Sequence, residues 1–423
     1  MTRRSCAIYV PGIVCVHLLL VAQAFQTSRL KRDKSQVFQA WKNPPPPVYM
    51  EFYFFNVTNP EVLLAGGKAS VQQIGPYTYR AQENVTFLEN GTKSAGNPEV
   101  DLVRTINIPL VALMNDMETF SFILRTVVCM FVDSLNVSLF MTRTVHEILW
   151  GFKDPLLTKI HSLQPEVDEY FGLMWKKNSL YKEGLGSNEK IETWNSLRKM
   201  SWWPSSQSSV ISGMEGAVFH PLINKNELLY IFAAELCRSI HLTYMKEVEV
   251  KGVRAYRFAP PADVLMSLNN AVACMLEMCL GIGVLKVGVC REGLPVVMSF
   301  PRFYQADKAY IDTVDGLKPQ KEYHETYLDL QPTLGVPIRS CKRTQLNVLL
   351  KRFSGFRNMR YIQKTVFPIL FVSEVRLSSL TLIFCLVSFP NDQKRAGVYL
   401  QPGNLVKRVP FSNSTRDASA KIL

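Results

Sequence analysis

The sequence predicts an α+β fold whose strands pair antiparallel. Short apolar runs separated by turn residues recur between Leu228 and Leu350, whereas apolar residues at the three- and four-residue spacing of helices concentrate between Met117 and Leu163. Strands and helices therefore occupy separate stretches, which argues against the alternating units of a parallel sheet. The 423-residue chain is long enough for one large domain or for two to three ordinary ones.

The N-terminus predicts entry into the secretory pathway. Two arginines precede an apolar stretch from Cys6 to Phe25. This stretch fits two alternatives: a signal peptide that is cleaved after Ala24, or a signal anchor of about 20 residues that stays in the bilayer. Basic residues lie on both of its sides, so the charge bias gives no orientation. We assign residues 1–28 to this segment, and either alternative delivers the following residues to the secretory lumen.

The first strand is predicted at Val48–Val57, which is aromatic and β-rich and ends at the turn Asn59-Pro60. Gly75 and Pro76 indicate a further turn that leads into a second strand. From Met117 to Leu135 apolar residues recur on one face of a helix.

Two shorter helices are expected after that. Thr144 and Glu147 have the spacing of a capping box, and Asp154-Pro155 places a good N-cap before a proline at the first helical position. The last of these helices carries two apolar columns, which is wider than one buried seam needs. Leu157 and His161 share the outer column.

Seven strand-like runs follow, separated by turns. They are Leu229–Phe232, Ser239–Tyr244, Ala255–Phe258, Val284–Val289, Pro295–Phe300, Tyr327–Leu330 and Gln345–Leu350. After Val375 the only apolar run, Leu377–Phe389, is too short to span a bilayer. We therefore interpret residues 376–423 as a disordered tail.

Sequons and cysteines agree with a lumenal environment. Five N-x-[ST] sequons occur, at Asn56, Asn84, Asn90, Asn136 and Asn413. Cys237, Cys274, Cys279 and Cys290 cluster in a short stretch, which in an oxidising lumen indicates two disulfides. The alternative, a zinc site, is not favoured, because the sequence has no Cys-x-x-Cys and no closely spaced histidine pair. Cys129, Cys341 and Cys385 are expected to be buried free thiols.

Composition and motifs argue against nucleic-acid binding and catalysis. The net charge of +13 is spread over the whole chain without a basic run interleaved with aromatics, so it fits anionic glycans, anionic lipid or acidic partners. The sequence has no nucleophile elbow, no P-loop and no metal-binding pattern among its six histidines. We expect no enzyme, no cofactor and no metal.

Several motifs together resemble the class B scavenger receptors. They are PPVYMEFYFFNVTN at 46–59, GPYTY at 75–79, ILWGFKDP at 148–155, FHP at 219–221, CRS at 237–239 and YRF at 256–258. Further motifs are most similar to the lysosomal member of that family: YFGL at 170–173, SFPRFYQAD at 299–307 and HET at 324–326. The resemblance covers residues 41 to 374, and its motifs are specific only in combination.

The resemblance implies a large irregular antiparallel β-barrel with an internal tunnel and an apical helical bundle. It assigns residues 29–375 to a lumenal ectodomain, with apical helices at about 117–200. The implied function is that of a lysosomal membrane receptor, which binds β-glucocerebrosidase through the apical helices, carries it from the endoplasmic reticulum through the Golgi and releases it in acid. The implied alternative is a scavenger receptor that passes cholesterol or another lipid through the tunnel. A homodimer is also implied.

The resemblance also assigns site residues. Its pH-sensing position matches His161, and the docking face comprises Leu156, Leu157, Ile160 and Lys153 beside it. The family pairing implies the disulfides Cys237–Cys290 and Cys274–Cys279, and glycans are expected at Asn56, Asn84, Asn90 and Asn136.

Two departures from the family pattern stand out. A titrating histidine of the family is Arg143 here, which keeps its charge at every physiological pH. The family's C-terminal membrane helix and sorting tail have no counterpart, so attachment to the membrane is expected through the N-terminus alone.

Overall fold

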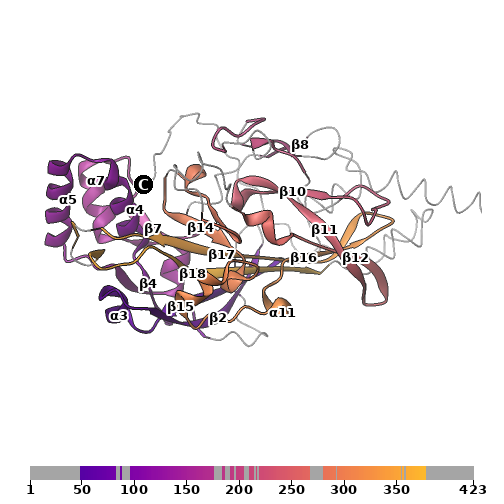
Figure 1. Cartoon of the computed structure of the whole chain (residues 1–423), viewed down its shortest axis with the longest axis horizontal. Coiled ribbons are helices and arrows are strands. Elements are labelled where there is room, and N and C mark those ends of the chain that lie inside the picture. The colour runs from indigo at the N-terminus through magenta and orange to yellow at the C-terminus, as the bar shows by residue number, and fades with distance from the viewer. Residues whose placement is uncertain are drawn as a thin grey trace, which may run out of the picture.

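The protein is described by a computed structural model that covers residues 48–81, 86–87, 96–175, 183–185, 191–194, 197–203, 209–213, 216, 219–266, 280–291, 293–353, 355–356 and 359–377. It is a mixed α+β structure dominated by one large sheet, as the sequence predicts (Figure 1). The sheet has 12 strands, and its longest hydrogen-bonded path runs β10-β11-β12-β16-β17-β18-β1-β2-β15. All neighbours on this path pair antiparallel except β15 and β2.

The strands of this sheet have the following bounds. They are β1 (Val48–Val57), β2 (Ala69–Ala81), β3 (Thr86–Phe87), β10 (Leu229–Ala233), β11 (Arg238–Val250), β12 (Val253–Ala259), β13 (Val284–Lys286), β14 (Val296–Ser299), β15 (Val314–Asp315), β16 (Tyr327–Gln331), β17 (Val336–Leu350) and β18 (Thr365–Leu377). Three two-stranded sheets accompany it: β4 (Leu102–Ile106) with β5 (Phe140–Thr144), β6 (Phe152–Lys153) with β7 (Tyr170–Phe171), and β8 (Glu183–Leu185) with β9 (Ile191–Trp194).

The large sheet is open, so the expected closed barrel is wrong for the part of the chain that the structure describes. Its path ends at β10 on one side and at β15 on the other, and no ladder joins these two strands there. Closure requires the first and last strands to pair along their length. With two residues, β15 is too short to provide such an edge.

The centre of the sheet is built from β1, β17 and β18. The predicted strand Val48–Val57 is confirmed as β1, which pairs with β2 and β18. The turn predicted at Gly75-Pro76 is wrong, because both residues lie inside β2. They occupy a bulge, where the register with β1 shifts between Phe52 and Phe54.

The other predicted strands are found with different lengths. Six of the seven runs between residues 229 and 350 overlap a strand over most of their length, and the exception is Val284–Val289. The last run, Gln345–Leu350, is only the end of the much longer β17. Val284–Val289 is a strand only as far as Lys286, after which a 3-10 turn, η5 (Gly288–Cys290), begins. The sequence reasoning missed β18, although it is central to the sheet.

The described α-helices are fewer than the strands. The α-helices are α3 (Pro60–Leu64), α4 (Ile108–Asp116), α5 (Phe122–Ser134), α6 (Val145–Trp150), α7 (Pro155–Leu163), α10 (Lys308–Asp312) and α11 (Lys321–His324). The other 3-10 turns are η1 (Met117–Thr119), η3 (Ala234–Leu236), η4 (Ala262–Leu265) and η6 (Pro301–Phe303). Helices were expected up to about residue 200, but beyond Leu163 the described part of that stretch holds only short strands and loops.

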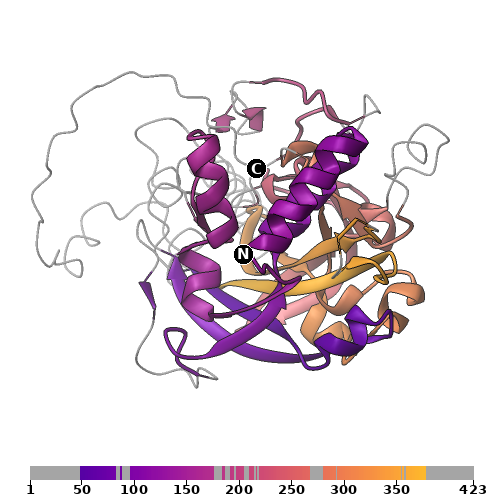
Figure 2. The same ribbon diagram turned by 90° about the vertical axis from the view of Figure 1, so that its left-hand side faces the viewer.

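The helices α4, α5 and α7 gather at one end of the molecule, which we call the helical end (Figure 1). In this view α5 is the outermost element, and Figure 2 looks onto the same end with α5 and α7 in front. A large buried core connects it to the sheet, since Leu110 and Met114 of α4 and Val132 of α5 belong to the same cluster as Phe367 and Phe371 of β18. Among the described residues, no helix has the length and apolar character needed to cross a bilayer.

Candidate functional site

The helix α7 carries most of the residues predicted to bind a partner, and its start is as expected. Asp154 is the N-cap, and its Oδ1 accepts hydrogen bonds from the backbone N–H groups of Leu156 (2.9 Å) and Leu157 (3.0 Å). Pro155 takes the first helical position. Burial raises the pKa of the Asp154 carboxyl, against the opposing effect of these two hydrogen bonds and of the nearby Arg143 charge.

The predicted docking face of α7 is largely inaccessible. Leu156 is 0% exposed and Leu157 is 6% exposed, while Ile160 is half-buried against the main core. The expectation that Leu157 lies on an outer column is therefore wrong. The helix packs against α4, and both Leu156 and Leu157 belong to the buried core. Its exposed apolar residue is instead Leu163, at 75% exposure.

His161 is half-buried on the last turn of α7. Its Nδ1 lies 2.7 Å from the backbone oxygen of Val167, so this nitrogen carries a proton and donates to that oxygen. A second proton can then add only at Nε2, and it would not break this bond. An ion pair joins Lys153 of β6, which precedes α7, to Glu169 in the segment that follows α7 (2.9 Å).

Two further charged residues of the helical end have defined surroundings. Arg143 replaces the family's histidine, and its guanidinium lies 4.7 Å from the ring centroid of Phe152. His146, one turn further on, faces Glu99 at 3.5 Å, and both side chains are exposed. Protonation of His146 would therefore be met by a carboxylate.

The helix α5 presents an apolar surface that the sequence reasoning did not single out. Its inner side is anchored by Cys129 and Val132, which are buried, and by Val128 and Phe131. Its outer side leaves four large apolar side chains more than half exposed, and Leu124 beside them is 46% exposed. We call this set the α5 surface: Phe122 (80% exposed), Ile123 (77%), Val127 (55%) and Met130 (61%).

The α5 surface follows from a sequence that is apolar almost all the way round. The predicted stripe included both the inner residues Val128 and Val132 and the outer residues Ile123 and Val127, so periodicity could not decide which side packs. A helix of this kind is normally buried on both sides. Large exposed apolar patches on soluble domains mark interaction sites, which makes the α5 surface the candidate functional site.

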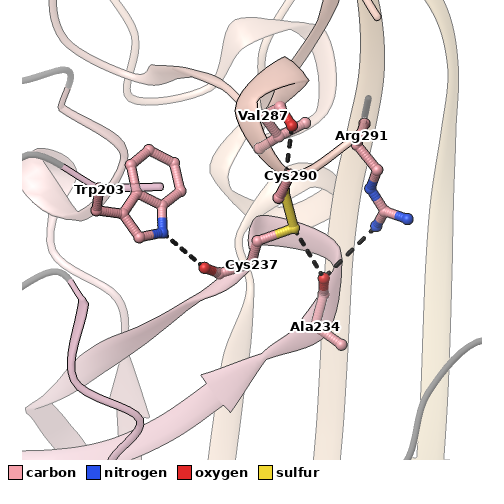
Figure 3. The surroundings of a disulfide bond; sticks show 6 residues. All are labelled: Trp203, Ala234, Cys237, Val287, Cys290 and Arg291. Atoms are coloured by element: carbon pink, nitrogen blue, oxygen red, sulfur yellow. Dashed lines mark hydrogen bonds between the residues drawn. A yellow bond between two sulfur atoms is a disulfide. The ribbon is translucent and has the colours of Figure 1, made fainter. Parts of the chain in front are cut away.

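A disulfide lies in what we call the disulfide region, around η3 and η5. Cys237 and Cys290 are joined with an S–S distance of 2.08 Å, the pair implied by the resemblance (Figure 3). The Trp203 indole N–H donates to the Cys237 carbonyl at 2.7 Å, and Arg291 reaches the Ala234 carbonyl at 3.5 Å. Cys274 and Cys279 lie outside the described residues.

The remaining predicted positions are the free cysteines and the glycosylation sequons, and only some of them lie among the described residues. Cys129 and Cys341 are buried free thiols, as predicted, and burial raises the pKa of each. Asn56 of β1 accepts the Arg104 N–H at 2.8 Å, which leaves its amide nitrogen for a glycan. Asn136 is exposed directly after α5. The other three sequons and Cys385 fall outside the described residues.

Among the described residues, no group of three or more histidine, cysteine and carboxylate side chains is placed to hold a metal ion. The arrangement found, an apolar helix face on a sheet domain, can bind a partner. The large antiparallel sheet with a helical end and the uncovered α5 surface defines a binding protein.

Comparison with known proteins agrees with this class. Residues 5–388 match the CD36 family, which extends the resemblance beyond residues 41–374 at both ends. Lysosome membrane protein 2 of Homo sapiens is 36% identical over 412 residues, covering 87% of this chain and 86% of that protein, and the Rattus norvegicus protein is 38% identical with the same coverage. Scavenger receptor class B member 1 of Bos taurus is 30% identical over 394 residues, covering 86% of this chain and 77% of that protein. The chain therefore belongs to the CD36 family, the class B scavenger receptors.

Proposed function

We propose that this chain is a lysosomal membrane receptor that binds β-glucocerebrosidase with its helical end and releases it in acid. The observation that carries the proposal is the α5 surface, which lies on the outermost helix and has no partner covering it among the described residues. Support for the lysosomal location comes from the relatives named lysosome membrane protein 2. Residues 1–28 would hold the chain in the membrane, with the remainder in the lumen along the route through the endoplasmic reticulum and Golgi.

The docking residues in this proposal differ from those first expected. Leu156 and Leu157 support α7 from inside, whereas Phe122, Ile123 and Val127 are free to enter a pocket of the enzyme. Interfaces depend on a few large apolar side chains near their centre. A glycan on Asn136 is compatible with docking, because it follows the C-terminal end of α5 while the most exposed apolar residues lie at its start.

Acid release would act through His161. The side chain lies on the last turn of α7, and protonation at Nε2 would add a positive charge at the same end of the molecule as the α5 surface. Arg143 cannot contribute to this change, because it stays charged at every relevant pH. His146 can take up a proton but does so beside Glu99.

The proposal is tested by binding of the purified chain to β-glucocerebrosidase at pH 7 and pH 5. Val127→Asp on the α5 surface should weaken binding at pH 7 by about tenfold or more, because a charge enters an apolar contact. The matched control is Val62→Asp on α3, since Val62 has a similar exposure of 47% on a different helix. Equal binding by the two variants would remove α5 from the interface.

A second pair of variants tests the pH response separately. His161→Ala should fold and bind at pH 7 but lose much of the difference between pH 7 and pH 5. His146→Ala serves as the control at the same end of the molecule. If His161→Ala still releases the enzyme at pH 5 like the unchanged chain, the sensing role is wrong and the docking surface is passive.

The alternative function, passage of cholesterol or another lipid through a tunnel, is supported by the relatives named scavenger receptor class B member 1. A cavity in the described residues, at the sheet face of β1 and β18, measures about 290 Å³ and is lined mainly by polar side chains. Sites for drug-sized ligands are usually larger and mostly apolar, so this cavity does not favour a sterol. Sterol loading of the purified chain, set beside the enzyme-binding assay, separates the two functions.

A homodimer that forms through the α5 surface would be disrupted by Val127→Asp. The molecular mass of the purified chain in solution would then fall from that of a dimer to that of a monomer in this variant.

A further inference from the structure

The cavity at the sheet face has a composition suited to a different ligand. It is lined by side chains of β1, β2, β17 and β18, by the η6 turn and by the segment that leads into α11. The lining residues are Glu51, Tyr53, Gln73, Arg302, Lys318, Gln320, Tyr323, His324, Arg343, Phe371 and Ser373. Three cations and one carboxylate therefore face one small space, leaving two net positive charges when the histidine is neutral.

Arg302 is a partly buried cation without a carboxylate partner among the described residues. Its Nε and Nη2 donate to Gln73 Oε1 at 3.0 and 2.7 Å, and among the described residues no carboxylate pairs with its guanidinium. Burial lowers the pKa of Arg302, as expected for a guanidinium that has lost water without gaining an anion. A buried charge of this kind is costly unless a counter-ion completes it.

The backbone around Arg302 is held in an unusual conformation. Arg302, Phe303 and Gln305 have φ values of 54°, 58° and 61°, in the left-handed region that residues with a side chain rarely adopt. The Arg302 N–H is fixed in place by Gln345 Oε1 at 2.6 Å. Strained residues of this type cluster where a side chain must be aimed at a ligand.

Arg343 and His324 face the same space with groups that can donate. Arg343 gives one hydrogen bond to the backbone oxygen of Glu325 at 2.6 Å. The His324 Nδ1 accepts the Gln320 N–H at 2.7 Å, so the proton of the neutral ring is on Nε2, for which no hydrogen-bond partner is found in the described part of the chain. Glu51 opposes these groups, although one of its oxygens accepts the Tyr53 hydroxyl at 3.1 Å.

We propose that this cavity is an anion site that binds a phosphate group between Arg302, Arg343 and Lys318, with His324 as a further donor. Arginine forks match the oxygens of phosphate in pairs, and the exposed Lys318 supplies a mobile point charge at the mouth. A volume of about 290 Å³ admits a phosphate or a small phosphomonoester with its water but not a whole lipid. The phosphate could belong to a soluble molecule or to a lipid headgroup, which share this chemistry.

Acid is expected to strengthen anion binding at this site. Burial and the charges of Arg302 and Arg343 hold the pKa of His324 at about 4, so the ring is neutral in the empty cavity at pH 7 and largely so at pH 5. A bound anion favours the protonated ring, and by linkage a lower pH then favours the bound anion. The other charged or titratable groups that line the cavity with the ring are Glu51, Tyr53, Lys318 and Tyr323, and Glu325 follows His324 directly in the chain.

The test is calorimetric titration of the purified full chain with inorganic phosphate at pH 7. Arg302→Gln should weaken binding about tenfold or more, and Lys318→Gln about threefold. Lys318 is exposed, so its variant keeps the fold even if Arg302→Gln does not. Lys364→Gln is the matched control, because it removes the same charge from an exposed position at the far end of β18 and should bind as the unchanged chain does.

Further measurements separate the sources and the role of His324. Glycerol phosphate that competes with inorganic phosphate indicates a soluble ligand, whereas capture by phosphatidic acid vesicles without such competition indicates a headgroup. Sulfate, whose charge is constant between pH 7 and pH 5, should bind more tightly at pH 5, and His324→Gln should abolish this gain. No binding of phosphate or vesicles, or binding that Arg302→Gln and Lys318→Gln leave at the level of Lys364→Gln, overturns the proposal.

Discussion

The helical end and the disulfide region differ in how they treat their large apolar side chains. On α5, Phe122 and Ile123 are more than three-quarters exposed. In the disulfide region, Trp203, Leu236 and Cys237 are all at least nine-tenths buried in one cluster. The chain is thus able to cover its aromatic and aliphatic groups where stability requires it. Their exposure on α5 therefore indicates a surface kept for a partner, and the stability of the fold must come from elsewhere.

The disulfide gives the largest expected effect in this comparison. It closes a loop between residues that are 53 positions apart, which stabilises the folded chain by about 4 kcal/mol in the chain-entropy model. Replacing Cys237 and Cys290 together by alanine should lower the free energy of unfolding by about that amount in denaturant titrations.

The control for that experiment is Cys129→Ala at the helical end, which removes a buried sulfur without opening a loop. If the double variant loses no more stability than this control, the disulfide region is not stabilised by its cross-link.

Within the helical end, burial should separate α7 from α5. Leu156→Ala removes a side chain that is 0% exposed and should cost about 2–5 kcal/mol of unfolding free energy. Ile123→Ala, on the α5 surface, should change stability by less than about 0.5 kcal/mol. Thermal and denaturant unfolding of the two variants measures this contrast. A cost for Ile123→Ala comparable to that of Leu156→Ala would mean that the α5 surface is part of the core.

The smallest effect concerns pH and the cap of α7. The pKa of Asp154 is raised in the folded chain above its ordinary value of 3.8, so the folded state holds this proton more tightly than the unfolded state does. Its contribution to stability is fully present below pH 3.8 and is lost as the pH rises through the raised value. Asp154→Asn keeps the cap, because asparagine is an equally good N-cap residue, and removes the titration. The free energy of unfolding, measured from pH 7 down to pH 4, should therefore increase less in the variant than in the unchanged chain. The same pH slope in both chains would assign the pH dependence to other groups.

Local patterns predicted much of this structure. The strand Val48–Val57, the capping box at Thr144 and Glu147, and the N-cap at Asp154 were predicted correctly because their signals involve neighbouring residues alone. The bulge at Gly75-Pro76 was predicted as a turn, because its reason is the register against β1, 20 or more residues away in the sequence. The strand β18 was missed for a related reason, since its place between β17 and β1 follows from long-range pairing.

By itself the sequence determined the α+β class, the family and the starts of α6 and α7. Only the tertiary structure decided which side of each apolar helix is covered. The helix α5 carries apolar residues around most of its circumference, so periodicity alone gives it no preferred side, and α7 carries two adjacent apolar columns whose coverage the sequence does not fix. The packing of α4 and the sheet beneath them buries Leu156 and Leu157 but leaves Phe122, Ile123 and Val127 in solvent. The same holds for the anion cavity, where Arg302 of η6 and Arg343 of β17 face one space although the sequence separates them by about 40 residues.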